Sequence, residues 1–169
     1  MDEKEGRDVA ICDIPGAFLQ TKASDGTIIK LQGTLVDTLV KIDPMWKEHV
    51  VHEGKINTPT IYSEAIKALY GTVDAAKLFY DSLVELLVEN LGFEMNLYDQ
   101  CVVNKMINGK QCTTVWYVDY LKILNIDPSV VMGIIDELDN RYGEIMPVSR
   151  SRDKVHNYLD IMFDFSNTG

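Results

Sequence analysis

The strongest constraint on the fold is a series of short apolar runs separated by tight turns in the second half of the sequence. Cys101–Val103 and Thr113–Val118 are two such runs, and Asn108-Gly109 lies between them. Asn-Gly is a favoured pair in two-residue hairpin turns, because both turn positions need a positive φ. Leu121–Ile126 is a third run, which predicts a second hairpin with Asp119-Tyr120 at its tip. We therefore expect an antiparallel sheet.

Two helices are expected before and after these strands. From about Val73–Asn90 apolar residues recur at helical spacing, and Gly92 ends the pattern. Pro128–Arg141 is the second helix, with Pro in its first turn and Gly143 just past its end. Further short strands are expected at residues 8–13, 27–32, 60–64, 144–149 and 154–165. This order of elements indicates an α+β fold, an antiparallel sheet with helices packed on one face.

The whole chain, residues 1–169, is interpreted as one domain. Residues 34–60 have a mixed pattern that two prolines and a glycine interrupt. Because these residues mark turns, we expect an irregular insertion there, with a short helix around residues 34–40 or 45–51.

Composition limits where the protein can reside. Hydrophobic residues make up 46% of the chain, enough for a core, but no run reaches the roughly 18 apolar residues of a membrane helix. The acidic start, Met-Asp-Glu-Lys-Glu-Gly, is the opposite of a secretory signal. The three cysteines show no Cys-x-x-Cys spacing, which favours reduced, structural thiols. We expect an intracellular protein without a membrane partner.

The formal net charge of −10 bears on possible partners. Proteins that bind nucleic acid unaided usually carry excess Lys and Arg, because these side chains neutralise phosphates. We therefore expect this chain alone to bind nucleic acid weakly. The abundant carboxylates fit either a solvated acidic surface or a site for a divalent cation.

Asp13 and Asp119 are the two candidate chemical residues. Asp13 ends an apolar strand, and Asp119 lies at a hairpin tip. If the two strands are neighbours, the carboxylates repel each other unless a divalent cation or a shared proton resolves the conflict. The alternative interpretation is that both acids only end their strands at the surface.

Two other clusters have a structural and a functional interpretation. His49-Val-Val-His52 could place two imidazoles on one helical face as metal ligands, or it is an ordinary exposed pair. Ser149–Arg152 is a small basic cluster that could contact a template phosphate, or it is a solvated turn.

Several short motifs resemble the reverse transcriptases of copia-type retrotransposons. Asp13–Leu19 is similar to their first polymerase motif, and Tyr117–Asp119 matches the first three residues of their Tyr-Val-Asp-Asp box. The remaining similar segments are Lys67–Gly71 with Phe79-Tyr80, Leu91–Phe93 with Tyr98–Cys101, and Lys154–Leu159. The matches occur in family order over residues 9–166, nearly the whole chain.

The resemblance implies a polymerase palm, a small antiparallel sheet backed by helices, that holds two Mg²⁺ ions. Asp13 and Asp119 would each bind metal, and the Ile14 carbonyl would help to hold the ion on the nucleotide side. The expected partners are an RNA or DNA primer–template and deoxynucleotides. The family works in the cytoplasm or in virus-like particles.

The resemblance also implies a site for the incoming nucleotide. The backbone of Gly16 and Ala17 would lie along its triphosphate. Phe18 would exclude a ribose 2′-hydroxyl, although it could instead be a plain core residue. Tyr70 and Gly71 would lie beside the nascent base pair, and Gly71 could equally be an ordinary turn before the helix.

The sequence departs from the family pattern in several places. Tyr120 replaces the second aspartate of the metal-binding box, and a neutral phenol is a poor ligand for Mg²⁺. Asp74 stands where relatives carry glutamine, and Asp153 and Asp160 where they carry glycine, for which we expect a loss of stability of ~1–3 kcal/mol each. The fingers segment that precedes the first motif, the thumb and the ribonuclease H are expected to be largely missing.

Two functional hypotheses follow. The first is an RNA-directed DNA polymerase module that uses Mg²⁺ on Asp13 and Asp119, and that Tyr120 impairs. The second is a retroelement remnant without catalysis, or a protein-interaction module.

Overall fold

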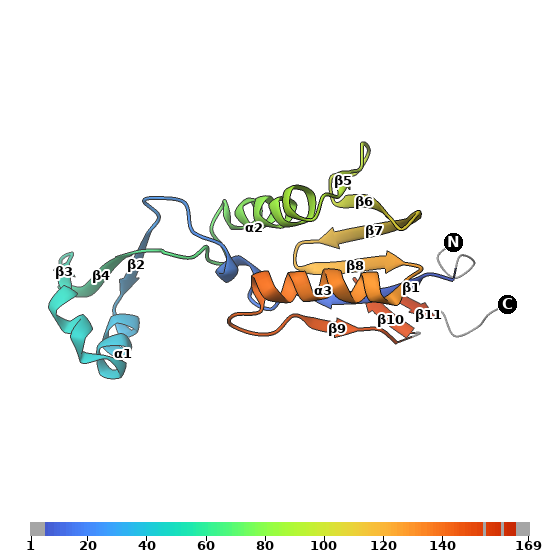
Figure 1. Cartoon of the computed structure of the whole chain (residues 1–169). Coiled ribbons are helices and arrows are strands. Elements are labelled where there is room, and N and C mark those ends of the chain that lie inside the picture. Colours follow the sequence, from blue (N-terminus) through green and yellow to red (C-terminus); the bar gives the residue numbers. More distant parts are fainter. Residues whose placement is uncertain (1–5, 154, 160, 165–169) are drawn as a thin grey trace.

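The computed structural model describes residues 6–153, 155–159 and 161–164. Its main body is a six-stranded sheet whose neighbouring strands all pair antiparallel, in the order β5-β6-β7-β8-β1-β9 (Figure 1). The strands are β1 (Asp8–Asp13), β5 (Glu94–Met95), β6 (Val102–Ile107), β7 (Lys110–Tyr117), β8 (Tyr120–Asn125) and β9 (Ser149–Ser151). The first strand of the chain therefore lies inside the sheet.

Two long helices cover one face of this sheet. They are α2 (Ala75–Val84), which continues as the π-helical segment η3 (Glu85–Asn90), and α3 (Pro128–Tyr142). The core between sheet and helices includes Ala10, Cys12, Val103, Leu121 and Ile123 from the strands, and Phe79, Leu83, Leu87, Ile135 and Leu138 from the helical segments. An antiparallel sheet with helices on one face confirms the α+β expectation.

The helices are also tied to each other. Ser82 of α2 and Tyr142 of α3 share a hydrogen bond of 3.0 Å between their hydroxyl groups. The ring of Tyr142 lies 5.6 Å from that of Phe79, and both side chains are about 1% exposed. Burying the Tyr142 hydroxyl is tolerated because its polar group has this partner.

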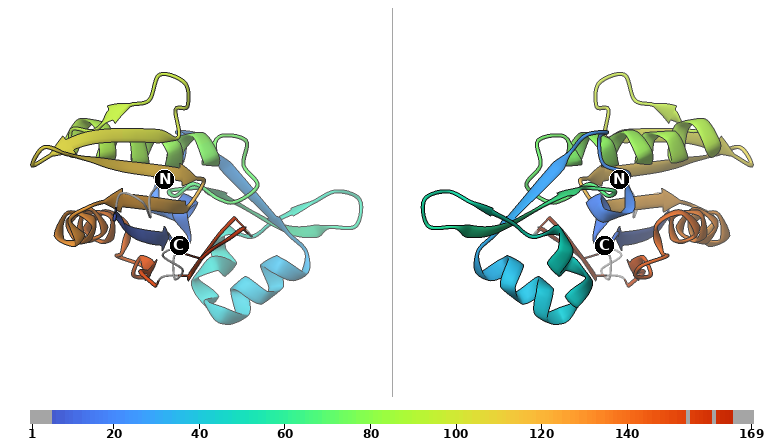
Figure 2. Two further views of the ribbon diagram at one scale, coloured as in Figure 1. Left: turned by 90° about the vertical axis from the view of Figure 1, so that its right-hand side faces the viewer. Right: turned by 90° about the vertical axis from the view of Figure 1, so that its left-hand side faces the viewer.

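Residues 28–64 form a small lobe that extends away from the main body (Figures 1 and 2). Its three-stranded antiparallel sheet has the order β2-β4-β3. The elements are β2 (Ile28–Gln32), α1 (Thr34–Ile42), the 3₁₀ helix η2 (Pro44–His49), β3 (Val51–Glu53) and β4 (Thr58–Glu64).

The expectation of an irregular insertion at residues 34–60 is therefore wrong. The prolines and the glycine lie at the ends of helices and strands or in turns, and they do not prevent these elements from forming. Pro44 starts η2, where a missing N–H is harmless, and Gly54 takes a positive φ of 72° in the turn between β3 and β4. α1 covers the first stretch considered for a short helix, residues 34–40, and η2 covers residues 45–49 of the second stretch.

Most other element predictions are confirmed. Asn108 and Gly109 both have positive φ, 52° and 74°, as their hairpin turn requires. The strand expected at residues 144–149 is wrong, because residues 143–146 form turns and bends and pairing starts at Ser149. The last stretch contains the hairpin of β10 (Val155–Tyr158) and β11 (Ile161–Asp164), while residues 154, 160 and 165 lie outside the described residues.

All three cysteines are free thiols. Burial raises the pKa of Cys12 to about 12 and that of Cys112 to about 11, so neither is a ready nucleophile. Among the described residues, no helix combines the length and apolarity needed to cross a bilayer.

Gly133, within α3, and Gly143, just past its end, allow a matched test of the contacts around this helix. A Cβ on the exposed Gly133 would meet nothing within 4 Å, so Gly133→Ala should raise the free energy of unfolding by about 0.5–1 kcal/mol. A Cβ on Gly143 would lie 2.5 Å from the Asp139 carbonyl oxygen. Gly143→Ala should therefore lower the free energy of unfolding. Urea unfolding of the two variants checks this, and changes of the same sign would contradict it.

Candidate functional site

Asp13 and Asp119 meet where β1 and β8 pair. Asp13 is the last residue of β1, and its partner in the β8 register is Tyr120. Asp119 lies in the two-residue turn between β7 and β8, and its carbonyl accepts a hydrogen bond from the Ile14 N–H at 3.1 Å. β1 and the hairpin strand β8 are thus immediate antiparallel neighbours, and Asp119 lies at the hairpin tip, as expected.

The side chain of Asp13 lies on the side of the sheet away from the helices. Cys12 and Ile14, which flank Asp13, are fully buried in the core beneath α2 and α3. Since successive strand residues point to opposite faces, the side chain of Asp13 points away from that core. Tyr120 shares this face, because it is directly paired with Asp13.

The turn that carries Asp119 has an unusual backbone. Val118, the first residue of the turn, has a φ of 55°. A β-branched residue rarely adopts a positive φ, and such strain is of order 1–3 kcal/mol. The pairing of β7 with β8 on both sides of the turn holds this conformation, so the position of Asp119 is set by the hairpin.

Asp13 is perturbed electrostatically. Burial raises the pKa of its carboxyl above the usual range, and the nearby negative charge of Asp119 raises the pKa further. Two carboxylates placed together in this way favour a proton or a cation between them. The described part of the chain contains no cluster of three or more His, Cys, Asp or Glu side chains suited to a metal ion. The position in β8 that pairs with Asp13 is occupied by Tyr120 and not by a third carboxylate.

An aromatic pair borders the two aspartates. The ring centroids of Phe18 and Tyr70 lie 4.3 Å apart, and Phe18 also lies 6.2 Å from Phe79 of the core. Burial raises the pKa of Tyr70, and the negative charge of Asp119 raises the pKa further, which places its phenol near the carboxylates. Phe18 thus both packs against the core and borders the site, so the two interpretations of this residue are compatible.

The two glycines that were assigned to the nucleotide site both take positive φ. Gly16 has a φ of 63° and precedes the 3₁₀ helix η1 (Ala17–Gln20). Gly71 has a φ of 91° in the turn before α2. Gly16 is half-buried, whereas Ala17 is fully buried, its backbone included. The structure therefore brings Asp13, Asp119, Ile14, Phe18 and Tyr70 together through direct contacts or charge effects.

Of the other two sequence clusters, the histidine pair does not join this site, whereas the basic cluster lies on β9, the strand that pairs with β1 at Asp13. His49 and His52 lie in η2 and β3, so they do not share a helical face. Arg150 lies 4.0 Å from Asp136 of α3, and Arg152 forms an ion pair with Asp8. Ser149 was not singled out by itself, yet it is the β9 partner of Asp13.

Asp74 also has a partner that the sequence did not reveal. The hydroxyl of Ser24, 50 positions away, donates a hydrogen bond to its carboxylate, and this bond is the main reason that the pKa of Asp74 is lowered. No local pattern signals such a contact, because it arises where the connection from β1 to the lobe passes the start of α2. Asp160 lies outside the described residues.

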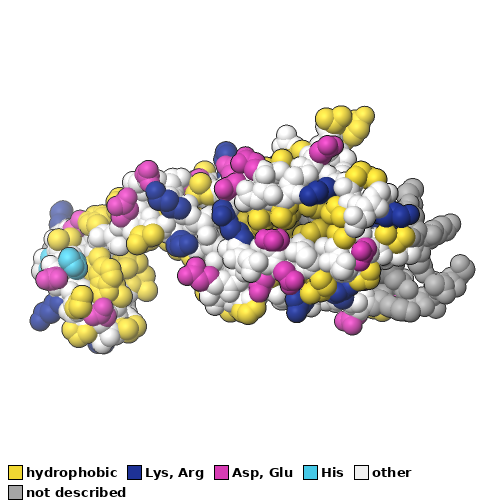
Figure 3. All heavy atoms as spheres, viewed as in Figure 1, with side chains coloured by type: hydrophobic (Ala, Val, Ile, Leu, Met, Phe, Trp, Pro, Cys, Tyr) yellow, Lys and Arg dark blue, Asp and Glu magenta, His cyan; other side chains and the backbone are white. Residues whose placement is uncertain are grey.

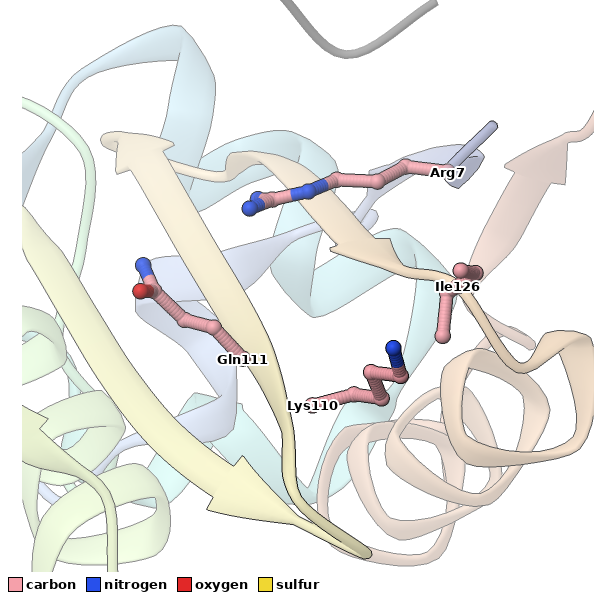
Figure 4. A pocket seen from close by; sticks show the side chains of 4 residues that line it. All are labelled: Arg7, Lys110, Gln111 and Ile126. Atoms are coloured by element: carbon pink, nitrogen blue, oxygen red, sulfur yellow. The ribbon is translucent and has the colours of Figure 1, made fainter. Parts of the chain in front are cut away.

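A hollow of about 310 Å³ lies at the other end of β8, lined by Arg7, Lys110, Gln111 and Ile126 (Figure 4). Ile126 follows the last residue of β8, whereas Asp119 precedes the first. The hollow is therefore separate from the aspartate pair and is not part of the candidate site.

Neither the protein-family models nor the curated proteins with which the sequence was compared include a match. The functional assignment therefore depends on the geometry of the site and on the motifs of the sequence.

The raised pKa of Asp13 predicts a pH-dependent stability. A carboxyl whose folded pKa exceeds its unfolded value of about 3.9 weakens the fold as pH rises through that range. Asp13→Asn should therefore stabilise the protein at pH 7 by a few tenths to about 1 kcal/mol, and the gain should vanish near pH 3.

Thermal unfolding between pH 3 and pH 8 tests this prediction. Glu137→Gln, a substitution of an exposed carboxylate on α3, is the matched control and should change little. A destabilised Asp13→Asn variant at pH 7 would show that Asp119 does not repel Asp13.

Proposed function

We propose that this chain is the palm portion of a copia-type reverse transcriptase whose metal site is impaired by Tyr120. The observation that carries the proposal is the placement of Asp13 and Asp119. Asp13 ends β1 with its side chain on the side of the sheet away from both long helices, and Asp119 lies in the turn that leads into β8, the antiparallel neighbour of β1. The sequence motifs that resemble this family contain the same two aspartates.

The donor groups suit one divalent cation better than two. Two carboxylates and the backbone carbonyl of Ile14 are hard oxygen ligands of the kind that Mg²⁺ prefers. The mutual repulsion that raises the pKa of Asp13 is relieved when a cation lies between the carboxylates. Two Mg²⁺ ions would supply stabilisation of the negative charge that grows on the attacking and leaving oxygens. With a phenol at position 120, the site has one formal negative charge fewer with which to hold the two Mg²⁺ ions.

The neighbouring groups suit a nucleotide. The Phe18–Tyr70 aromatic pair borders the carboxylates and offers a flat apolar surface. The positive φ of Gly16 turns the backbone beside Ala17, and the half-buried Gly16 is the part of this turn whose backbone can approach phosphate oxygens. In this proposal Phe18 disfavours a ribose 2′-hydroxyl, and Tyr70-Gly71 borders the base pair.

The second candidate is a remnant or interaction module without catalysis. The observation that favours it is the direct pairing of Tyr120 with Asp13 on the functional face. A phenol that is 40% exposed fills the place of a ligand, and it is a poor ligand for Mg²⁺. Metal binding and primer extension separate the two candidates.

Metal binding can be measured on the chain itself. We expect millimolar Mg²⁺ to raise the melting temperature slightly, because it binds the folded pair and not the unfolded chain. Tyr120→Asp should lower the melting temperature without metal and should enlarge the Mg²⁺-dependent rise, since a third carboxylate adds both repulsion and a ligand.

The matched control is Tyr98→Asp, the same substitution at a fully exposed loop position, which should not change the response to Mg²⁺. Asp13→Asn should abolish the response. A response that survives Asp13→Asn would show that Mg²⁺ binds elsewhere.

Catalysis is tested by grafting the palm into an active copia-type enzyme, once unchanged and once with Tyr120→Asp. Loss of one metal ion should cost at least ~3–4 kcal/mol in the transition state, so the unchanged graft should extend primers hundreds of times more slowly. Primer extension with Mg²⁺ gives both rates. Rates within about tenfold, a difference of ~1.4 kcal/mol, would contradict the proposed impairment. If neither graft extends primers, the remnant candidate is favoured.

A further inference from the structure

The loop between β5 and β6 exposes two large apolar side chains. Leu97 is 96% exposed and Tyr98 is 98% exposed. We call residues 96–101 the anchor turn. Its conformation is held from within, because Asn96 Oδ1 accepts hydrogen bonds from the N–H groups of Tyr98 and Asp99 at 2.8 and 3.2 Å.

A third bond completes the anchor turn. Asp99 Oδ1 accepts from the Cys101 N–H at 2.8 Å. The turn therefore presents its two apolar side chains in a fixed arrangement. A surface that is ordered before binding loses less conformational entropy when a partner docks.

The lobe carries a hollow of complementary character. We call it the lobe groove; it lies between α1 and the β3–β4 hairpin and has a volume of about 530 Å³. It is lined by Val36, Val40, Val50 and Pro59, and by Asp37, Lys41, Lys47 and His52. The apolar residues provide a surface for an apolar anchor, and Lys41 and Lys47 outnumber Asp37 among the charged lining residues, so the charged part of the lining is net positive. A volume in the range of roughly 300–1,000 Å³ can accept an inserted group such as one or two side chains.

We propose that the anchor turn of one molecule docks into the lobe groove of a second copy of this chain. The charges are complementary. The anchor turn contains Asp99, and Glu94 is exposed on the adjoining β5, whereas Lys41 and Lys47 line the groove. Opposite charges at the border of an apolar contact guide docking and set its register.

The placement of the two surfaces makes this contact intermolecular. The lobe extends from one end of the main body, whereas the β5–β6 loop projects from the top of the body near its other end (Figure 1). Figure 3 shows hydrophobic side chains gathered on the lobe, well separated from the far end of the body. One molecule therefore cannot fill its own groove, and the contact is head-to-tail. Such heterologous contacts leave a free surface at each end, so assemblies grow beyond a dimer.

The contact is small, so we expect weak association. Two apolar side chains and a few border charges place it well below a standard interface, with a dissociation constant on the order of 10–100 µM. The charge contribution should weaken as salt rises from ~0.05 to 0.5 M.

Sedimentation velocity of the intact chain from 5 to 500 µM tests the proposal, using two complementary variants. The anchor variant carries Leu97→Ser and Tyr98→Ser, and the groove variant carries Lys41→Glu and Lys47→Glu. All four positions are exposed, so both variants should fold, which circular dichroism verifies. Val73→Ser, which removes an exposed apolar side chain outside both surfaces, is the control.

We expect the wild type and the control to form species larger than a dimer as concentration rises. Each variant alone should remain monomeric. An equimolar mixture of the two variants should form a dimer that does not grow, because only one intact anchor turn and one intact groove can meet. A monomeric wild type, a wild type that stops at a dimer, or a mixture that stays monomeric would each overturn the proposal.

Discussion

The pairing of β1 with β8 is the interaction on which the rest of the structure depends. All six residues of β1 pair with β8, and this strand also carries β9 on its other edge. Its residues Val9–Cys12 are all buried, and Ile14 beyond them is fully buried. Burying one such aliphatic side chain contributes roughly 1.5–3 kcal/mol, so the strand is held by its side chains as well as by its hydrogen bonds. The same pairing brings Asp13 to Tyr120 and the Ile14 amide to Asp119.

The candidate site lowers the stability of the fold that forms it. The β1–β8 pairing brings two like charges together, and Val118 holds a strained turn beside them. Strain and repulsion of this kind persist only where the surrounding structure enforces them. Here the apolar core on the other face of the same strands holds them in place. In the function proposed above, Tyr120 stands where the family has a carboxylate, so it lessens the repulsion and also removes a metal ligand.

The lobe is joined to the body by two chain segments that run side by side. The Ala23 N–H donates to the Ile66 carbonyl oxygen at 3.0 Å, and the Ala68 N–H donates to the Thr21 carbonyl oxygen at 3.0 Å. The connection therefore resembles a short ladder instead of a free linker. The lobe has its own buried residues, among them Val36 and Ile61, and its groove is lined by lobe residues alone.

Local patterns were sufficient for the elements whose causes are local. The hairpin at Asn108-Gly109 follows from the need for positive φ, and the limits of α3 follow from Asp127-Pro128 at its start and Gly143 at its end. The two long helices and most strands could be placed in this way. Asp13 and Asp119 could also be singled out, because each acid interrupts an apolar strand pattern.

The rest was decided by contacts between residues far apart in the chain. The lobe sheet forms because β2 pairs with β4, about 30 positions later in the chain. A short stretch of sequence cannot reveal such a pairing. The contact between Ser24 and Asp74 and the stacking of Phe18 on Tyr70 arise in the same way. Sequence therefore specified which groups could carry chemistry, since that depends on side-chain type. Only the tertiary structure decided which of them meet, since proximity depends on how β1, β8 and the lobe connections pack together.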